Sequence, residues 1–155
     1  TRDISTIENT KQVATSQSMT GYKSVAPDQI PVNYIRLMND WSLIAANNTV
    51  ITSTWGGIGV FDGKSVAFSF IKKNEGMVKV IDGVDTYTIS FYTEAYRNNL
   101  KSNGEGLSLL KTPTGATSFS EAWMILECKK LSSQLMDGNT DTKMYIGEIV
   151  NVWIK

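Results

Sequence analysis

The sequence predicts a mainly β fold, a β-barrel with a few short helices. Stretches rich in β-branched and aromatic residues recur at even spacing, and turn signals such as Asp62-Gly63 separate them. Only two or three short stretches have helical spacing. This pattern favours a barrel over a parallel α/β sheet.

The composition is that of a single globular domain. The 155 residues are enough to bury a real core, and 41% of them are hydrophobic while 19% are charged. Lys+Arg and Asp+Glu number 15 each, so no basic excess indicates nucleic acid or an anionic membrane as a partner. No apolar run approaches the roughly 20 residues that a membrane-spanning helix needs.

The reactive side chains are few. Cys128 is the only cysteine and there is no histidine, which excludes a disulfide framework and a Cys/His zinc site. A Ser-His or Cys-His nucleophile pair is excluded as well, so a general hydrolase is disfavoured. Because Cys128 lies in an apolar alternating run, we expect a buried, inert thiol. No catalytic side chain and no metal ligand is assigned.

Two regions differ in composition. Residues 1–25 are rich in Ser, Thr, Gln and Asn and are predicted to form a polar N-terminal arm, while residues 26–155 form the folded domain. We expect the arm to dock on a partner surface, and a second subunit is the candidate. The first residue is Thr1 rather than methionine, so we expect that a leader or another segment was removed.

Alternation and turn residues predict the order of elements. Predicted strands are Trp41–Ala46, a strand from Thr49, Ser65–Ile71, Thr86–Tyr92, Glu121–Leu131 and Lys143–Lys155. Predicted helices are Met77–Ile81, ended by Asp82-Gly83, and Glu94–Leu100.

Two further predictions concern the second half of the chain. Residues 101–119 contain several glycines and a proline, and they are predicted to be a long loop with one turn at Leu107–Leu110. In the last strand, one face is expected to carry a row of apolar side chains that only Glu148 interrupts. The members of that row are Met144, Ile146, Val150, Val152 and Ile154.

The stretch Thr49–Gly59 combines features of a ligand site. It begins with β-branched residues and is expected to break at Gly56-Gly57, where glycine lets a flat ligand approach the backbone closely. Hydroxyl side chains, the indole of Trp55 and the glycine turn together suit a planar ligand with polar edges. The alternative is an ordinary strand followed by a loop with a bulge.

Four runs of residues, in order, resemble the flavin reductase-like, flavoredoxin-type proteins. The run Thr52–Gly59 is similar to the T-A-S-W-G-G-L-G signature of that family. The flanking runs are similar to D-W-x-L-I-T-A, F-T-L-S-F-F and M-Y-I-G-E-I, and they are Asp40–Ala46, Tyr87–Tyr92 and Met144–Ile149. Together the matches cover most of residues 26–155.

The resemblance implies a fold, a cofactor and a site. It implies an FMN-binding split barrel of Greek-key type, usually a homodimer, that passes electrons from a reduced nicotinamide, NADH or NADPH, to flavin or another acceptor. The flavin carries this chemistry and the protein supplies binding and orientation. The residues that the resemblance places around the flavin ring are Thr52, Ser53, Thr54, Trp55 and Gly56.

The phosphate end of the implied site departs from the family pattern. The family carries an R-P-Q-R-Y-T motif after the strand that ends at Ile71, and its counterparts here include Lys72, Lys73 and Asn74. Lysine keeps the charge but lacks the bidentate fork of arginine. Glu75 reverses the second charge, and Met77 replaces a threonine that could bond a phosphate oxygen. Lys72, Lys73 or the start of the Met77 helix would then have to hold the phosphate.

Two further features of the family are missing. The loop at residues 101–106 lacks the family's S-G-R element, and Thr142 and Lys143 occupy the place of the histidine that often precedes the last strand. Two readings therefore stay open. The chain is an NAD(P)H-dependent flavin oxidoreductase, or a degenerate split-barrel protein without flavin that acts in binding or structure. The resemblance implies the cytoplasm, whereas a removed signal segment would imply export, so the compartment is left open.

Overall fold

A computed structural model describes residues 1–5, 19, 21–30, 41–53, 56–136 and 139–155. The architecture is mainly β, as predicted, and two short α-helices accompany the strands. None of the helices in these residues is long and apolar enough to cross a membrane. The strands of the main sheet are β1 Arg2–Asp3, β2 Lys23–Val25, β3 Ser42–Ala46, β4 Thr49–Ser53, β5 Gly56–Phe61, β6 Lys64–Lys72, β7 Thr86–Phe91, β10 Met124–Met136 and β11 Asn139–Ile154.

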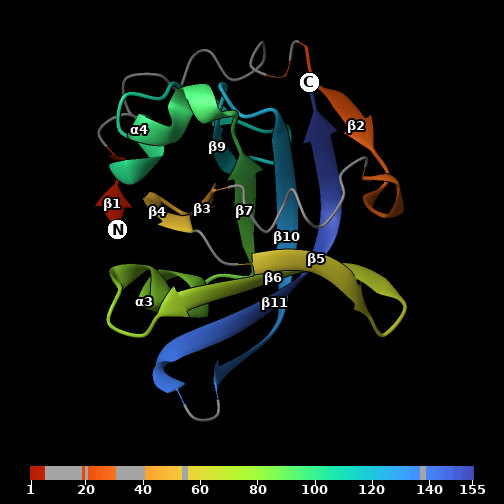
Figure 1. Ribbon diagram of the computed structural model, residues 1–155. Helices are drawn as coiled ribbons and strands as arrows, with labels where there is room; N and C mark the ends of the chain where they lie inside the picture. Colours follow the sequence, from red (N-terminus) through yellow and green to blue (C-terminus); the bar gives the residue numbers. More distant parts are fainter. Residues whose placement is uncertain (6–18, 20, 31–40, 54–55, 137–138) are drawn as a thin grey trace.

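The main sheet is antiparallel and coils around a core. Its strand order is β1-β4-β3-β7-β10-β11-β6-β5, with β2 paired to the far end of β11. Figure 1 shows β5 and β6 running across the direction of β7 and β10, because the long β11 carries the sheet from one orientation to the other. As a result, β4 and β5, distant in strand order, approach each other at one side. The arrangement fits a split barrel.

The central strands β3, β7 and β10 are buried on both faces. On one face Ile44, Ile89 and Leu126 are cross-strand neighbours in the barrel core. On the other face Leu43 and Ile125 belong to a second apolar cluster. This double burial explains why the five residues of β3 are all buried.

A small hairpin covers the second face, and it corrects one prediction. Strands β8 Leu109–Lys111 and β9 Thr117–Phe119 form a two-stranded sheet, so the predicted turn at Leu107–Leu110 is wrong. The hairpin packs on the polar side of β7, where the Thr88 hydroxyl donates to the Thr117 carbonyl oxygen at 2.6 Å. Alternation could not reveal this, because the partner strand lies 29 residues away.

A buried carboxylate ties this hairpin to the long strands. Glu127 on β10 is only 4% exposed, and its carboxylate accepts hydrogen bonds from the hydroxyls of Thr112 and Thr114. The indole N–H of Trp153 on β11 donates to it at 2.9 Å. Three donors satisfy a group that would otherwise be costly to bury.

The last strand contains a β-bulge that overturns the predicted apolar row. Glu127 pairs with Asn151 and Cys128 pairs with Ile149, so Val150 is an extra residue and is 42% exposed. Before the bulge the buried, inward-facing side chains are Tyr145 and Ile149. Met144 and Ile146, predicted for the apolar row, therefore lie on the opposite face of the strand. The bulge also marks the point where β11 changes partner from β6 to β2.

The glycine stretch is the second correction in strand assignment. Gly56–Phe61 does not break the sheet, because it forms strand β5 and pairs with β6 from Gly56–Ser69 to Phe61–Lys64. The predicted turn at Asp62-Gly63 is confirmed, with positive φ at both residues.

The remaining predictions of local structure agree with the observed elements. Both predicted helices are confirmed, as α3 Gly76–Asp82 and as the 3₁₀ turn η3 Glu94–Tyr96 continued by α4 Arg97–Lys101. A further 3₁₀ turn is η2 Pro27–Gln29. Cys128 is fully buried as predicted, and burial raises the pKa of its thiol.

The described ends of the 1–25 segment pair with this chain's own sheet. Arg2 and Asp3 extend the sheet beyond β4, and Ile4 is fully buried. Lys23–Val25 lie against the end of β11. At both ends the segment is therefore part of the folded domain.

Strands β7, β10 and β11 meet most closely at Gly147. A Cβ atom at this position would contact the Tyr87 hydroxyl, and it would lie 3.0 Å from the Cβ of Cys128. The Tyr87 hydroxyl is buried and makes no hydrogen bond among the described residues. Only glycine allows the phenol ring to lie against β11 at this point.

We expect Gly147→Ala to lower the free energy of unfolding by about 1–3 kcal/mol, because the methyl group overpacks a closed core. Urea denaturation monitored by tryptophan fluorescence measures the loss. Gly57→Ala is the matched control, since a Cβ there meets nothing within 4 Å. Adding Tyr87→Phe should recover part of the stability by removing the contacting hydroxyl, and an unchanged midpoint in Gly147→Ala would contradict the close packing.

Candidate functional site

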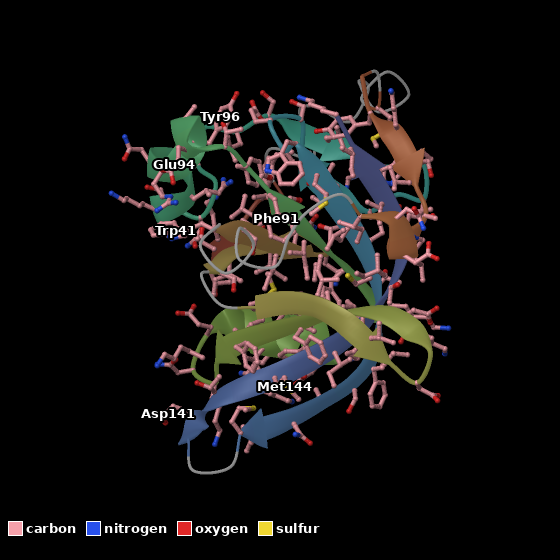
Figure 2. The ribbon with its side chains drawn as sticks, turned by 45° about the vertical axis from the view of Figure 1, so that its right-hand side comes forward. Trp41, Phe91, Glu94, Tyr96, Asp141 and Met144 are labelled. Atoms are coloured by element: carbon pink, nitrogen blue, oxygen red, sulfur yellow. The ribbon has the colours of Figure 1, made fainter. Side chains whose placement is uncertain are left out.

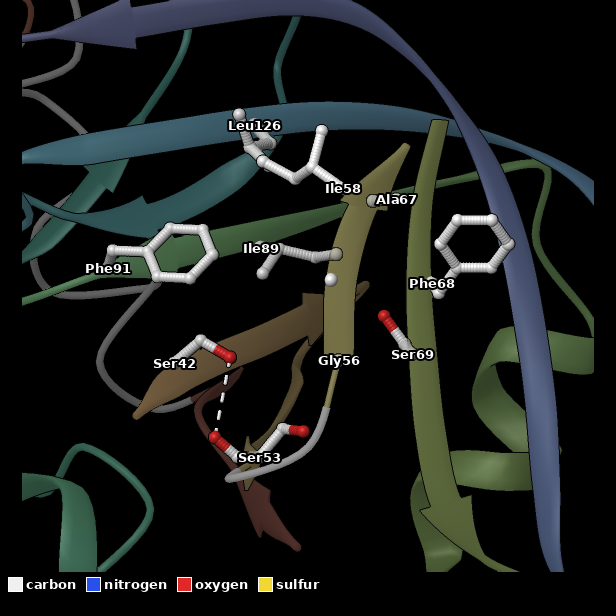
Figure 3. Close-up of a pocket in the computed structure, with 11 residues that line it drawn as sticks. Ser42, Ser53, Gly56, Ile58, Ala67, Phe68, Ser69, Ile89, Phe91 and Leu126 are labelled. Carbon is white, nitrogen blue, oxygen red and sulfur yellow. Dashed lines mark hydrogen bonds between the residues drawn. The ribbon is translucent and has the colours of Figure 1, made fainter. Parts of the chain in front are cut away.

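A narrow hollow opens where β4 and β5 approach each other; we call it the inner hollow (Figure 3). Its walls come from β3, β4, β5, β6, β7 and β10, which makes it the open seam of the coiled sheet. The lining residues are Ser42, Ser53, Gly56, Gly57, Ile58, Ala67, Phe68, Ser69, Ile89, Phe91 and Leu126.

The inner hollow is apolar at one side and hydroxyl-lined at the other. Figure 3 shows Ile89, Phe91 and Leu126 forming the apolar wall. Across from them, the hydroxyls of Ser42, Ser53 and Ser69 belong to three different strands. The Ser42 hydroxyl donates to the Ser53 carbonyl oxygen at 3.4 Å. Such a slot suits the edge of a planar ligand that is apolar on its faces and polar at its rim.

A second hollow, the outer hollow, shares the lining residue Ser53 with the first. Its cavity volume is about 180 Å³, and it is lined by residues of β4, β6 and the turn that follows β6. The lining residues are Ile51, Thr52, Ser53, Phe70, Ile71, Lys72 and Glu75. The outer hollow thus brings Thr52 and Ser53, predicted for the ring, together with Lys72, predicted for the phosphate.

A third hollow continues past Lys72 and Glu75 along the turn before α3; we call it the turn hollow. Lys73, Asn74 and Asp141 complete its lining. Figure 2 shows Asp141 near the start of β11, at the end of the β10–β11 pair where Met136 pairs with Asn139. All three residues predicted for the phosphate end, Lys72, Lys73 and Asn74, therefore border one hollow, in the company of two carboxylates.

The two glycines of β5 that line the inner hollow have different surroundings. At Gly56, a Cβ atom would lie 2.7 Å from the carbonyl oxygen of Phe68 on β6, so no other residue fits without moving that strand. At Gly57, a Cβ would point into open space. A flat group could therefore approach the backbone at Gly57, while Gly56 fixes the close contact with β6.

Thr52 is already used by the fold. Its hydroxyl donates to the carbonyl oxygen of Leu100, and its backbone N–H donates to the side-chain oxygen of Asn103 at 3.0 Å. These bonds attach the end of β4 to α4 and to the loop that follows it. The polar groups of Thr52 therefore serve the fold in this structure, and its part in ring binding stays a prediction.

The other predicted ring residues divide into two groups. Ser53 is buried and borders both hollows, and Gly56 lies at the mouth of the inner one. Thr54 and Trp55 lie outside the described residues, between the end of β4 and the start of β5.

Glu75 is hydrogen-bonded to Thr1, the residue before β1. The Thr1 hydroxyl donates to the Glu75 carboxylate at 2.7 Å. This hydrogen bond is the main cause that lowers the pKa of Glu75, so the side chain is a carboxylate at neutral pH. The negative charge predicted to oppose a phosphate therefore borders the outer hollow in a fixed position.

Met77 is unrelated to the hollows. Its side chain is fully buried in the core cluster under α3. A threonine at this position would put its hydroxyl in the core rather than beside a ligand. Met77 therefore borders none of the three hollows.

Sequence reasoning missed Ser42, Ser69 and Phe91 as lining residues. Ser42 and Phe91 lie within runs that carried the family resemblance, and they are cross-strand partners in the structure. Ser69 lies on the inward face of β6, which alternation reveals only once Ala67 and Ile71 are known to be buried. The missing information was strand pairing rather than residue type.

The fold is flavin reductase-like. No protein-family model matches the sequence, and no curated protein in the search matches it. Solved structures do match. Flavoredoxin from Methanosarcina acetivorans has a TM-score of 0.65 at 14% identity, over 76% of this chain and 69% of that one.

Two flavin-using enzymes are similar to the same extent. The NADH:FAD oxidoreductase from Streptomyces globisporus has a TM-score of 0.66 at 12% identity, over 84% of this chain and 86% of that one. The styrene monooxygenase flavin reductase from Pseudomonas putida S12 has a TM-score of 0.62 at 11% identity, over 74% and 79%. At these identities the likeness establishes the fold.

We expect Thr52→Val to lower the free energy of unfolding by about 1 kcal/mol, because the Leu100 carbonyl loses one of its two donors and keeps only the Asn103 backbone N–H. Chemical denaturation measures this, with Thr93→Val on an exposed turn as the matched control. Ligand affinity should stay within about twofold of wild type, since the hydroxyl faces Leu100. Unchanged stability combined with a large loss of affinity would show that the hydroxyl serves the ligand instead.

Proposed function

We propose that this protein binds a flavin at the open seam of the barrel and passes electrons from a reduced nicotinamide to that flavin or to another acceptor. The observation that carries the proposal is that Ser53 lines two hollows, the apolar slot of the inner hollow and the more polar outer hollow. An isoalloxazine has the same division, with flat apolar faces and a rim of hydrogen-bonding atoms. The flavin-using proteins of similar fold support this choice of ligand.

The protein's own part in this reaction is binding and orientation. A bound flavin supplies the redox chemistry, so no acid or base side chain is required and the lack of histidine is no obstacle. Ser53 and the backbone at Gly56-Gly57 would bond the ring edge, with Thr54 and Trp55 as further contributors, while Thr52 would hold the end of β4 in position. Ile89, Phe91 and Leu126 would exclude water from one face of the ring. FMN is the flavin and NADH or NADPH the reductant that the sequence resemblance implies.

The alternative is a split barrel that has kept its architecture without the cofactor. Glu75 and Asp141 beside the phosphate end favour it, because an anionic group would be repelled there.

One experiment distinguishes the two proposals: a visible absorption spectrum of the purified protein, followed by titration with oxidised flavin. A flavin spectrum or saturable micromolar binding supports the first proposal, and oxidation of NADH and NADPH is then assayed. A colourless protein that binds no flavin supports the second.

We expect Ser53→Ala to weaken flavin binding by about fivefold to tenfold, the effect of one lost hydrogen bond to a neutral group. Fluorescence quenching of the flavin measures the affinity. Ser132→Ala on the exposed part of β10 is the matched control and should bind as wild type does. Equal affinity in Ser53→Ala and wild type would contradict a ring site at Ser53.

We also propose that the protein works as a homodimer. Phe68 and Phe70 on β6 pair with Ile146 and Met144 on β11, and their side chains lie on the face of the sheet opposite the core, only partly buried. This outer face is continuous with the outer hollow, which Phe70 also borders. A second copy on this face would cover the apolar row and narrow the hollow at the same time.

Met144→Glu should shift the protein toward the monomer, because it puts a charge in the middle of the proposed contact. Sedimentation velocity over a concentration series measures the association state. Leu135→Glu is the matched control, since Leu135 is 43% exposed and pairs with Lys143, on the opposite side of the sheet from Met144. A dimer that persists in Met144→Glu, or a wild-type monomer at all concentrations, would contradict this interface.

A further inference from the structure

The charged side chains that line the tail end of the proposed site are balanced in number. Two positive ones, Lys72 and Lys73, and two negative ones, Glu75 and Asp141, border the outer and turn hollows. The Thr1 ammonium group lies beside them, 3.4 Å from the Glu75 carboxylate. A phosphate monoester carries about −1.5 to −2 charge at neutral pH and is normally held by arginine forks or by an excess of positive charge. The described residues of these hollows offer neither.

The carboxylate nearest the ring end is fixed rather than mobile. Glu75 borders both the outer and the turn hollow, and the Thr1 hydroxyl donates to it at 2.7 Å. The same bond lowers the pKa of Glu75, which keeps its charge at neutral pH. Moving this side chain away from an approaching anion would break that hydrogen bond.

The same residues suit a chain of neutral hydroxyl groups. Glu75 and Asp141 accept hydrogen bonds, Lys72 and Lys73 donate them, and the amide of Asn74 does both. Each hydroxyl of a polyol is both a donor and an acceptor, so it can bond to either kind of partner. An uncharged ribityl tail therefore matches this mixture better than a phosphorylated one.

We propose that the flavin taken at this site has a tail without phosphate, riboflavin being the simplest such compound, and that Glu75 selects against FMN. The inference rests on the proposed flavin-binding function and adds the class of flavin. In this reading the flavin is a substrate that diffuses in and out, since the charge that holds FMN permanently in place is lacking.

The test is a matched titration of riboflavin and FMN into wild-type protein at low ionic strength, read by quenching of flavin fluorescence. We expect riboflavin to bind about fivefold more tightly than FMN, the size of one partly screened charge repulsion. Added salt should narrow the difference. Glu75→Gln should tighten FMN about fivefold and leave riboflavin within about twofold of wild type.

A control variant separates the local charge from the net charge. Asp28→Asn also removes one negative charge, but Asp28 lies on η2, borders none of the three hollows and should change neither affinity. Unfolding midpoints of all variants confirm that each is folded.

The outcomes separate the two proposals. Tighter binding of FMN than of riboflavin by wild-type protein, or an FMN affinity that Glu75→Gln does not change, overturns the selection by Glu75 and leaves flavin binding intact. Failure of both flavins to bind overturns the proposed function, and with it the inference that rests on it.

Discussion

The pairing of β11 with β10 on one side and with β6 on the other is the constraint on which the rest of the sheet depends. At Gly147 on β11, the Tyr87 ring fills the space that a side chain would need. β10 in turn carries β7, β3 and β4. The sheet changes orientation along β11, which brings β4 and β5 together, and the inner and outer hollows lie along the seam between them.

Polar groups around this frame fall into two classes. Some serve the fold alone, such as Glu127, whose three donors fasten the β8–β9 hairpin, and Thr52, whose hydroxyl faces Leu100. Others line the seam, such as Ser69. Both classes contain buried hydroxyls on strands, and only their partners distinguish them. A hydroxyl that satisfies a backbone carbonyl is less available to a ligand than one that faces a hollow.

The charge around the β6–α3 turn has a functional meaning only in combination with the hollows. Lys72 and Lys73 alone would indicate an anion site, and Glu75 alone would indicate a lost one. With Asp141 brought in from β11, the set is balanced and rich in both donors and acceptors. A flavin reductase-like fold with such a turn can still hold a flavin ring, while it treats the end of the flavin tail differently from a site built for phosphate.

Local chemistry let the sequence by itself determine the mainly β class, most strand positions, the Asp62-Gly63 turn, the two short helices and the buried Cys128. β-branched runs, turn residues and helical spacing act over a few residues, so they can be read without the fold. The order of four runs was also enough to indicate a flavin reductase-like architecture, and Ser53, Gly56 and Lys72 to Asn74 were named from it.

Only the tertiary structure decided the facts that need a distant partner. The bulge at Val150 depends on the register with β10, the burial of Thr88 depends on the β8–β9 hairpin, and the meeting of Asp141 with Glu75 depends on the β6–β11 pairing. Alternation divides the side chains of a strand into two faces, and pairing with the neighbouring strand decides which face is buried. For the same reason Ser42 and Ser69 became lining residues only when three strands were seen to converge on one seam.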